Sequence, residues 1–294
     1  MSKVKLKGAR ASGRFSSFAL VTALAMTNVA LSAQAPQPTA PPKPAPASPK
    51  QTPAPPRTDA SAKEKPTVQT DLPSARSIID RYVKAIGGRE AILSHSSSHA
   101  TGSMTVTGSG ITGVLDVYGA KPNKSLVKIN LGGIGDVIEG FDGVHAWSVS
   151  PMTGPMLTQG KELEEKKFDG DFYSDLHDEG RYASMKTVEK TTFDGRPCYK
   201  VSLVKKDGAE DFDFYDVETG LKAGAMLTRE SQMGPMPVTQ VHSDYKKFGN
   251  LLVPTTLKQT AMGVEQVLKV NTFEFDNVPD STFEPPAQIK ALIK

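Results

Sequence analysis

The chain has 294 residues, which is long enough for one large domain or two small ones. Its formal net charge of +3 is unevenly distributed, because residues 1–72 hold 10 of the 35 Lys and Arg residues and only 3 of the 32 Asp and Glu residues. The remainder, with 25 basic and 29 acidic residues, has a net charge of −4. A nucleic-acid-binding domain needs a basic face, so this charge distribution argues against that class of function.

The first 35 residues are typical of an export signal. Five basic residues precede a mostly apolar run from Phe18 to Leu31, and Ala33-Gln34-Ala35 supplies small residues at the spacing of a cleavage site. The apolar run is short for a transmembrane helix, which needs about 20 residues. We therefore expect a signal peptide at residues 1–35 and a location in the periplasm or cell envelope, with a retained membrane anchor as the alternative.

Residues 36–72 are predicted to form a disordered linker rich in Pro and Ala. Eleven of the 22 prolines of the chain lie between Pro36 and Pro66. Such a segment buries too little apolar surface to offset its conformational entropy, and proline stiffens it toward extended polyproline II conformations. The folded domain is expected at residues 73–294, and about 220 residues suffice for a sizeable core.

Helical patterns occur at two places in this domain. Apolar residues recur at helical spacing between residues 75 and 86, Pro73 suits the first turn, and Gly87-Gly88 suits the end. A short second helical turn is predicted over residues 89–93. Residues 161–176 form a charged segment with weak helical periodicity, which predicts one or two short helices covering an open end of a sheet.

After residue 100, apolar and polar residues alternate, as they do in strands with one buried face. Asp-Gly pairs at tight-turn positions separate the strand-like runs, and one solvated face favours antiparallel pairing. The sequence therefore predicts an α+β fold with a meandering antiparallel sheet of roughly nine to eleven strands. The clearest alternating runs are residues 103–107, 127–131, 211–215 and 272–276.

Motifs of enzymes and metal proteins are not recognisable in the sequence. His95 and His99 are four apart but span a serine loop, whereas His145 and His242 are expected in strands. No Gly-x-Ser-x-Gly elbow and no phosphate-binding loop occurs. The single cysteine, Cys198, lies in a predicted strand and is expected to be a buried, inert thiol. We predict no catalytic residue, no metal and no cofactor. A hydrolase that acts on envelope lipids is a further hypothesis, and only the expected location supports it.

Eight methionines lie in the predicted domain, among them Met152, Met156, Met226, Met233, Met236 and Met262, and the tripeptide Gly-Pro-Met occurs twice, at residues 154–156 and 234–236. Methionine adapts its shape and suits surfaces that accept varied apolar partners. The alternative interpretation is that these methionines fill gaps in the core and that the two tripeptides are coincident turns.

The order of these features resembles the outer-membrane lipoprotein-sorting superfamily, whose members share the LolA/LolB-like fold. The resemblance covers about residues 75–286. It implies an N-terminal helix, a strongly curved meandering sheet that forms a half-barrel, short lid helices across its mouth, and a hydrophobic cavity that holds acyl chains. The motifs that carry the resemblance are Ile86-Gly87-Gly88-Arg89-Glu90-Ala91, Phe141-Asp142-Gly143-Val144-His145-Ala146-Trp147 with Gly154, Tyr245-Lys246-Lys247-Phe248-Gly249 with Pro254, and Asn277-Val278-Pro279-Asp280-Ser281-Thr282-Phe283.

We therefore expect an exported, non-enzymatic carrier or sensor that binds a lipid or the acyl chains of a lipoprotein in a hydrophobic cavity, as a monomer and without nucleic acid. The alternative is an envelope protein-interaction module without a small-molecule ligand, which the linker and the acidic lid segment motivate. The candidate lining residues are Trp147, Met156, Phe168, Phe172, Phe212 and Met226.

Overall fold

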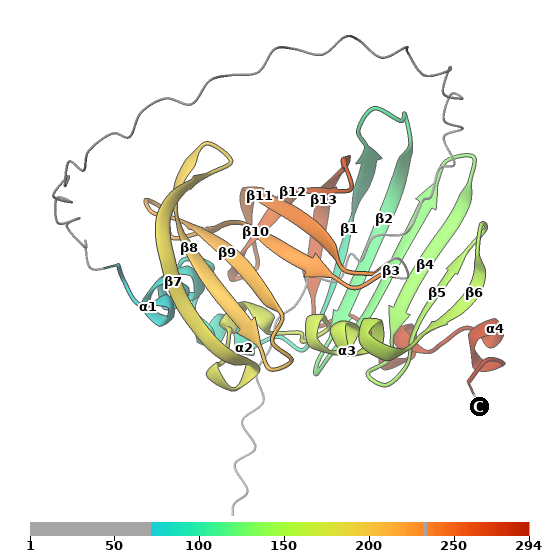
Figure 1. The fold of residues 1–294 in the computed structure, drawn as a ribbon. Coiled ribbons are helices and arrows are strands. Elements are labelled where there is room, and N and C mark those ends of the chain that lie inside the picture. Colours follow the sequence, from blue (N-terminus) through green and yellow to red (C-terminus); the bar gives the residue numbers. More distant parts are fainter. Residues whose placement is uncertain (1–71, 232–233, 294) are drawn as a thin grey trace, which may run out of the picture. The chain divides into compact units, whose positions relative to one another are not determined.

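The computed structural model describes residues 72–231 and 234–293, so the predicted signal peptide and the linker up to residue 71 lie outside the described residues. A single antiparallel sheet of 13 strands forms the body of the described part and curves into a half-barrel (Figure 1). The predicted α+β half-barrel is confirmed, but the predicted number of strands was too low. The strands are β1 (Ser97–Val106), β2 (Thr112–Ala120), β3 (Lys124–Leu131), β4 (Gly135–Phe141), β5 (Ala146–Ser150), β6 (Gly154–Thr158), β7 (Tyr182–Phe193), β8 (Arg196–Lys205), β9 (Glu210–Asp216), β10 (Lys222–Arg229), β11 (Met236–Phe248), β12 (Leu251–Ala261) and β13 (Val264–Phe275).

Two meanders make up the sheet. Strands β1 to β6 pair in chain order, strands β7 to β13 do the same, and the pairing of β1 with β13 joins the two halves. The register shifts by one residue between Thr101 and Gly102 at this junction. A Cβ atom on Gly102 would lie 2.1 Å from the backbone oxygen of Lys269, so only glycine permits the close approach of the two strands.

The helices are short and lie near the ends of the strands. They are α1 (Ala75–Ala85), α2 (Arg89–Leu93), α3 (Gly160–Asp169) and α4 (Ala287–Lys290), with 3₁₀ turns η1 (Ser174–Leu176), η2 (Glu179–Arg181) and η3 (Asp280–Phe283). Helix α1 occupies the segment with the predicted apolar stripe, α2 the predicted short second turn, and α3 with η1 the predicted lid segment. Among the described residues, no helix is long and apolar enough to cross a membrane.

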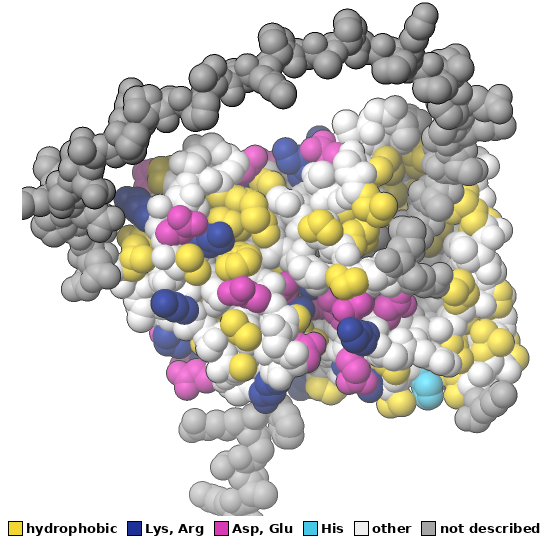
Figure 2. All heavy atoms as spheres, viewed as in Figure 1, with side chains coloured by type: hydrophobic (Ala, Val, Ile, Leu, Met, Phe, Trp, Pro, Cys, Tyr) yellow, Lys and Arg dark blue, Asp and Glu magenta, His cyan; other side chains and the backbone are white. Residues whose placement is uncertain are grey.

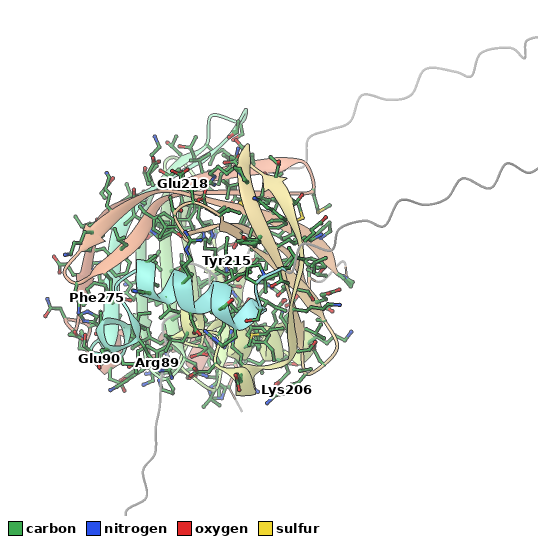
Figure 3. The ribbon with its side chains drawn as sticks, turned by 90° about the vertical axis from the view of Figure 1, so that its left-hand side faces the viewer. Arg89, Glu90, Lys206, Tyr215, Glu218 and Phe275 are labelled. Carbon is green, nitrogen blue, oxygen red and sulfur yellow. The ribbon has the colours of Figure 1, made fainter. Side chains whose placement is uncertain are left out.

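Helix α1 packs on the sheet through the predicted apolar stripe. Ile79 is fully buried, Tyr82 stacks at a tilt against Tyr215 of β9 with ring centroids 5.5 Å apart, and Leu251 of β12 closes the same cluster. The backbone N–H of Leu252 donates to the Ile86 carbonyl at 2.9 Å, which ties the end of the helix to β12. Figure 3 shows α1 lying across the sheet with Tyr215 beside it.

The C-terminal segment packs on a separate cluster around Trp147. Phe283 of η3 and Ile289 of α4 bury the indole, and Gly140 on β4 pairs with Trp147 on β5. A Cβ atom at Gly140 would lie 2.2 Å from the Trp147 ring. The C-terminal turns therefore cover one face of β4 to β6.

Replacing Gly140 by Ala should destabilise the domain by about 1–3 kcal/mol, because the new methyl group overpacks the Trp147 cluster. Chemical denaturation gives the free energy of unfolding. The matched control is Gly132→Ala, where a Cβ atom meets nothing within 4 Å and the change should be near neutral. Equal stability of the two variants would contradict this account of the cluster.

Candidate ligand site

The two faces of the sheet can be assigned from the strand register. Side chains alternate between faces along a strand, and directly paired residues share a face. Gln240 of β11 pairs with Gln259 of β12, and Gln240 also pairs with Ala225 of β10, which pairs with Asp213 of β9. These residues lie on the face that α1 covers, which is the concave face, and the opposite face is called the outer face.

An apolar pocket lies on the concave face where the two meanders join. Its volume is about 40 Å³ and its walls come from β1, β2, β11, β12 and β13. Aliphatic side chains predominate, so the pocket suits hydrocarbon. The apolar pocket is lined by Ala100, Leu115, Val117, Gln240, Val253, Pro254, Leu257, Lys258, Gln259, Leu268 and Val270.

A second pocket of about 40 Å³, the polar pocket, lies beside the first and shares Val253 and Pro254 with it. Helices α1 and α2, the turn η1 and strands β11 to β13 form its walls. Three polar side chains reach it, and the remainder are apolar. The lining residues are Tyr82, Ile86, Ile92, Asp175, His242, Leu251, Leu252, Val253, Pro254 and Phe273.

Helix α3 bridges the mouth of the half-barrel. On one side of the helix, the Lys166 ammonium lies 3.0 Å from Glu139 of β4; on the other side, the carboxylate of the adjacent Glu165 lies 3.4 Å from Arg229 of β10. Six strands separate β4 from β10 in the sheet order. A helix with its side chains is only about 10–12 Å across, so two adjacent residues of α3 reach both strands because the sheet curves. The segment predicted to cover an open end of the sheet therefore lies across that opening.

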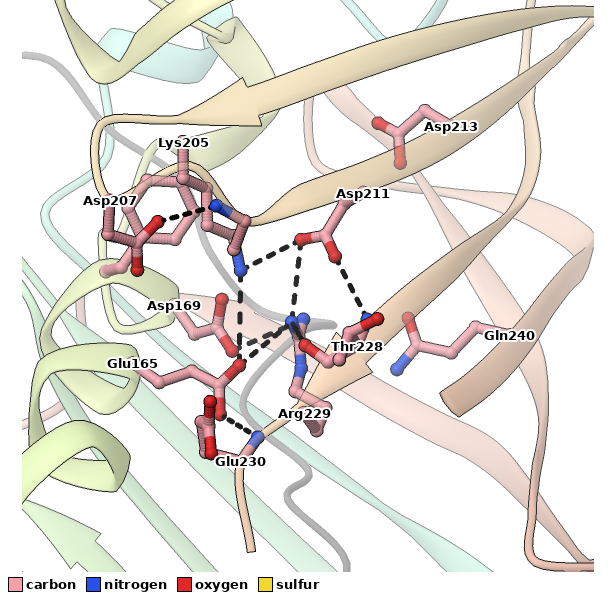
Figure 4. A network of polar contacts seen from close by, with 12 residues as sticks. Glu165, Asp169, Lys205, Asp207, Asp211, Asp213, Thr228, Arg229, Glu230 and Gln240 are labelled. Carbon is pink, nitrogen blue, oxygen red and sulfur yellow. Dashed lines mark hydrogen bonds and ion pairs between the residues drawn. The ribbon is translucent and has the colours of Figure 1, made fainter. Parts of the chain in front are cut away.

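A buried ion network holds α3 to β8, β9 and β10 (Figure 4). The Arg229 guanidinium lies 3.3 Å from Asp169 and 3.6 Å from Asp211, and the Lys205 ammonium lies 3.0 Å from Asp211. The Glu165 carboxylate also accepts a hydrogen bond of 2.9 Å from the backbone N–H of Glu230. Burial raises the pKa of Glu165, against the opposing effect of the Arg229 charge. Figure 2 shows acidic and basic side chains side by side around α3.

A second buried charged group, Asp213, lies under α1 and η1. Its carboxylate is 2.8 Å from the Lys222 ammonium and 3.0 Å from the His177 Nε2 atom, and it accepts a hydrogen bond of 3.0 Å from the Tyr215 hydroxyl. Burial by itself would raise the pKa of Asp213, but the Lys222 charge and the His177 hydrogen bond hold that pKa well below its ordinary value. The concave face therefore combines an apolar floor with fixed charges along one wall.

Three of the predicted lining residues lie on the concave side. Phe168 of α3 stacks under the Arg181 guanidinium, 3.7 Å from its ring centroid, and Phe172 is fully buried in the cluster that includes α1. Met156 of β6 pairs with Ser148, which pairs with Glu139, and so it shares the face that α3 bridges. Phe168 and Phe172 belong to the lid segment and Met156 shares the face that α3 bridges, but none of the three lines the two pockets described above.

The other three predicted lining residues lie on the outer face. Trp147 is buried under the C-terminal turns. Phe212 of β9 and Met226 of β10 are direct cross-strand partners, one position out of phase with Asp213 and Ala225, and Met226 is 42% exposed. Figure 2 shows hydrophobic side chains gathered over β8 and β9. The alternation of side chains along a strand does not say which of the two sets faces inward. For this reason three of the six predicted residues lie on the concave side and three on the outer face.

His242 is a site residue for which the sequence predicted only a strand position. It is 4% exposed on β11, it lines the polar pocket, and its Nε2 atom has no hydrogen-bond partner among the described residues. Its alternation with Met236 and Val238 was the available signal, because a histidine in phase with buried apolar residues must itself be buried. Within residues 72–231 and 234–293, no group of three or more potential ligands could hold a metal. Cys198 is buried and burial raises its pKa, as expected of an inert thiol.

Comparison with known proteins gives a likeness of fold. No protein-family model matches the chain, and a search of curated proteins gives no match. A solved structure of a DUF1329 family protein from Desulfovibrio piger is similar with a TM-score of 0.52 and 14% identity, over 71% of this chain and 97% of that one. A LolA superfamily protein from Nitrosomonas europaea matches with a TM-score of 0.48 and 14% identity, over 73% of this chain and 99% of that one.

At a TM-score of 0.52 and 14% identity, the likeness to the DUF1329 family protein is one of fold alone, and it leaves the ligand to be argued from the site.

Proposed function

We propose that this protein is a non-enzymatic carrier or sensor that holds the acyl chain of a lipid or a lipid-modified protein on the concave face of its sheet. One observation carries the proposal: an aliphatic pocket lies on the face whose mouth α3 bridges. Burial of hydrocarbon at about 25 cal/mol per Å² would supply the binding free energy.

Movement of α3 is part of this proposal. Ligand pockets usually measure about 300–1,000 Å³, whereas the apolar pocket measures about 40 Å³. An acyl chain therefore needs more room than this pocket has while α3 bridges the mouth. Charged contacts hold α3 to strands of both halves of the sheet, so breaking those on one side would open the face without disturbing the strand pairing. Met156 on the concave face and Phe168 and Phe172 of the lid segment belong to the proposed path of the chain.

Residues 1–35 are proposed to be a signal peptide, residues 36–72 a linker and residues 73–294 the binding domain, acting in the bacterial envelope. The basic start, the apolar run and the small residues before Pro36 support the signal. N-terminal sequencing of the mature protein tests this assignment. A start at Pro36 supports cleavage, whereas a start near Met1 supports the retained anchor.

Binding of a fluorescent fatty-acid probe tests the proposed function. The wild-type protein should bind it, and Leu257→Ala should weaken binding about tenfold, because the shortened side chain removes apolar contact worth roughly 1–2 kcal/mol from the pocket. The matched control is Val144→Ala, which truncates a residue that is 62% exposed and should change nothing. A wild-type protein that binds no probe and yields no lipid on solvent extraction would contradict the proposal.

The alternative function, a protein-interaction module, has its most obvious docking site at the free sheet edge β7. Within the part of the chain that the structure describes, this 12-residue strand pairs only with β8. Two register shifts interrupt it, and Lys186, Glu189 and Lys190 are exposed on it. Bulges and charges of this kind oppose strand addition by a partner, so the edge gives the alternative little support. Recovery of one stoichiometric partner by crosslinking, from a protein that binds no lipid, would favour it.

A further inference from the structure

The polar pocket contains a buried atom that lacks a partner. Most buried polar atoms in proteins are hydrogen-bonded, so an exception calls for an explanation. The Nε2 atom of His242 is such an exception among the described residues, and His242 lines the pocket. Burial, reinforced by the Lys222 charge, lowers the pKa of His242 to about 3, so the ring is neutral at physiological pH.

The charge of the polar pocket restricts what can enter it. Asp175 is its charged lining residue, and one oxygen of this carboxylate accepts a hydrogen bond of 2.8 Å from the Tyr82 hydroxyl. Among the described residues that line the pocket, none is a lysine or an arginine. A second carboxylate or a phosphate would face Asp175 without a compensating cation in the walls. The pocket therefore disfavours an anionic group.

A hydroxyl group can both pair with the His242 Nε2 atom and enter the pocket without adding a negative charge beside Asp175. It can donate one hydrogen bond and accept others, so it can pair with the His242 Nε2 atom in either neutral tautomer. It can also donate to the Asp175 carboxylate, which still has acceptor capacity beside Tyr82. An ester without a hydroxyl group could serve only the donor tautomer of His242.

The polar pocket lies next to the apolar pocket. The two share Val253 and Pro254, so a molecule whose chain lies in the apolar pocket would present its head at the polar pocket. We propose that the ligand is an uncharged amphiphile whose hydroxyl head occupies the polar pocket against His242 and Asp175, while its acyl chain occupies the apolar pocket. This inference rests on the proposed acyl-chain function and adds the class of head group.

Competition against the fluorescent acyl probe tests the inference with three competitors of equal chain length: a 1-monoacylglycerol, a fatty-acid methyl ester and a free fatty acid. The wild-type protein should bind the monoacylglycerol about tenfold more tightly than the methyl ester, which corresponds to about 1.4 kcal/mol for a hydrogen bond to a buried acceptor. The free fatty acid should bind no better than the methyl ester.

Two variants separate the head from the chain. His242→Leu should abolish the preference for the monoacylglycerol, so that the affinities for the monoacylglycerol and the methyl ester become equal. Leu257→Ala, in the apolar pocket, should weaken both by the same factor and keep their ratio. Should His242→Leu fail to fold, Tyr82→Phe gives a second test: it removes the donor to Asp175, so the preference for the hydroxyl head should increase.

Each outcome bears on one of the two proposals. Equal wild-type affinity for monoacylglycerol and methyl ester, or a preference that persists in His242→Leu, would overturn the hydroxyl-head inference and leave the carrier proposal standing. An unchanged preference in Tyr82→Phe would also count against the inference. A wild-type protein that binds none of the acyl compounds would remove the carrier proposal, and the inference with it.

Discussion

Replacing Arg229 by Met should lower the free energy of unfolding by about 3–5 kcal/mol, because removing one member of a buried ion network leaves its partners uncompensated. The guanidinium lies within 4 Å of Glu165, Asp169 and Asp211, and the arginine is mostly buried. Those three carboxylates would retain only Lys205 as a buried cation in the network. Denaturant unfolding monitored by circular dichroism measures the loss.

The same substitution should release the lid, since α3 contacts β10 through Arg229. Limited proteolysis should cut residues 160–170 faster in the variant than in the wild-type protein. The matched control is Lys161→Ala on the same helix, which removes a lysine that is 83% exposed and 3.6 Å from Glu230. Exposed pairs contribute about 0–1 kcal/mol, so this control should be close to wild type. If Arg229→Met and Lys161→Ala unfold alike, the network does not hold the lid.

Acid should destabilise the domain in two steps, and His242 should account for the first. Burial and the Lys222 charge lower the pKa of His242 to about 3 in the folded protein, whereas an unfolded histidine titrates near its ordinary value of about 6.5. The unfolded chain therefore binds the proton more readily. The stability that His242 contributes is complete above about pH 6.5 and is lost as the pH falls toward 3.

The expected loss is about 1.4 kcal/mol per pH unit, or about 3 kcal/mol between pH 6.5 and pH 4. Asp213 should add a second loss below about pH 4, because its lowered pKa stabilises the fold only while its carboxylate is ionised. Unfolding free energies measured from pH 7 to pH 3 define both steps. The charged groups that act on His242 are Lys222, Asp213 and Arg196.

His242→Leu should remove the first loss of unfolding free energy, between pH 6.5 and pH 4, and should keep the second loss below about pH 4. Its control is His99→Leu, which removes a partly exposed histidine paired with Asp116 at 2.9 Å and should keep the first step. A first step of the same size in the wild-type and His242→Leu proteins would show that His242 does not control the acid response. This readout is independent of any lipid, so it tests the buried state of His242 separately from the head-group inference.

Local patterns predicted the elements whose signal lies within a few residues. The helical spacing of residues 75–86, together with Pro73 and Gly87-Gly88, predicted α1, which extends from Ala75 to Ala85. The alternation of apolar and polar side chains at every second residue predicted the antiparallel strands. The charged segment 161–176 predicted α3 and η1. These signals are local because each depends on which residues share a face of one helix or strand.

The strand number was too low because the short edge strands carry a weak signal. Strand β5 has five residues, and β6 is also five residues long and begins with Gly154-Pro155. Glycine and proline together usually indicate a turn. Proline is tolerated in β6 because this strand lies at the free edge of the sheet, where an N–H group can be dispensed with.

The sequence by itself determined that the described domain is a meandering antiparallel sheet with one N-terminal helix and a charged lid segment, because these follow from side-chain periodicity. Only the tertiary structure decided that Trp147, Phe212 and Met226 lie on the outer face and that His242 lies at a pocket. Curvature brings β4 and β10 to two sides of α3, and pairing of β1 with β13 places the apolar pocket between distant segments. Such contacts depend on which strands become neighbours in space, and no spacing along the chain encodes them.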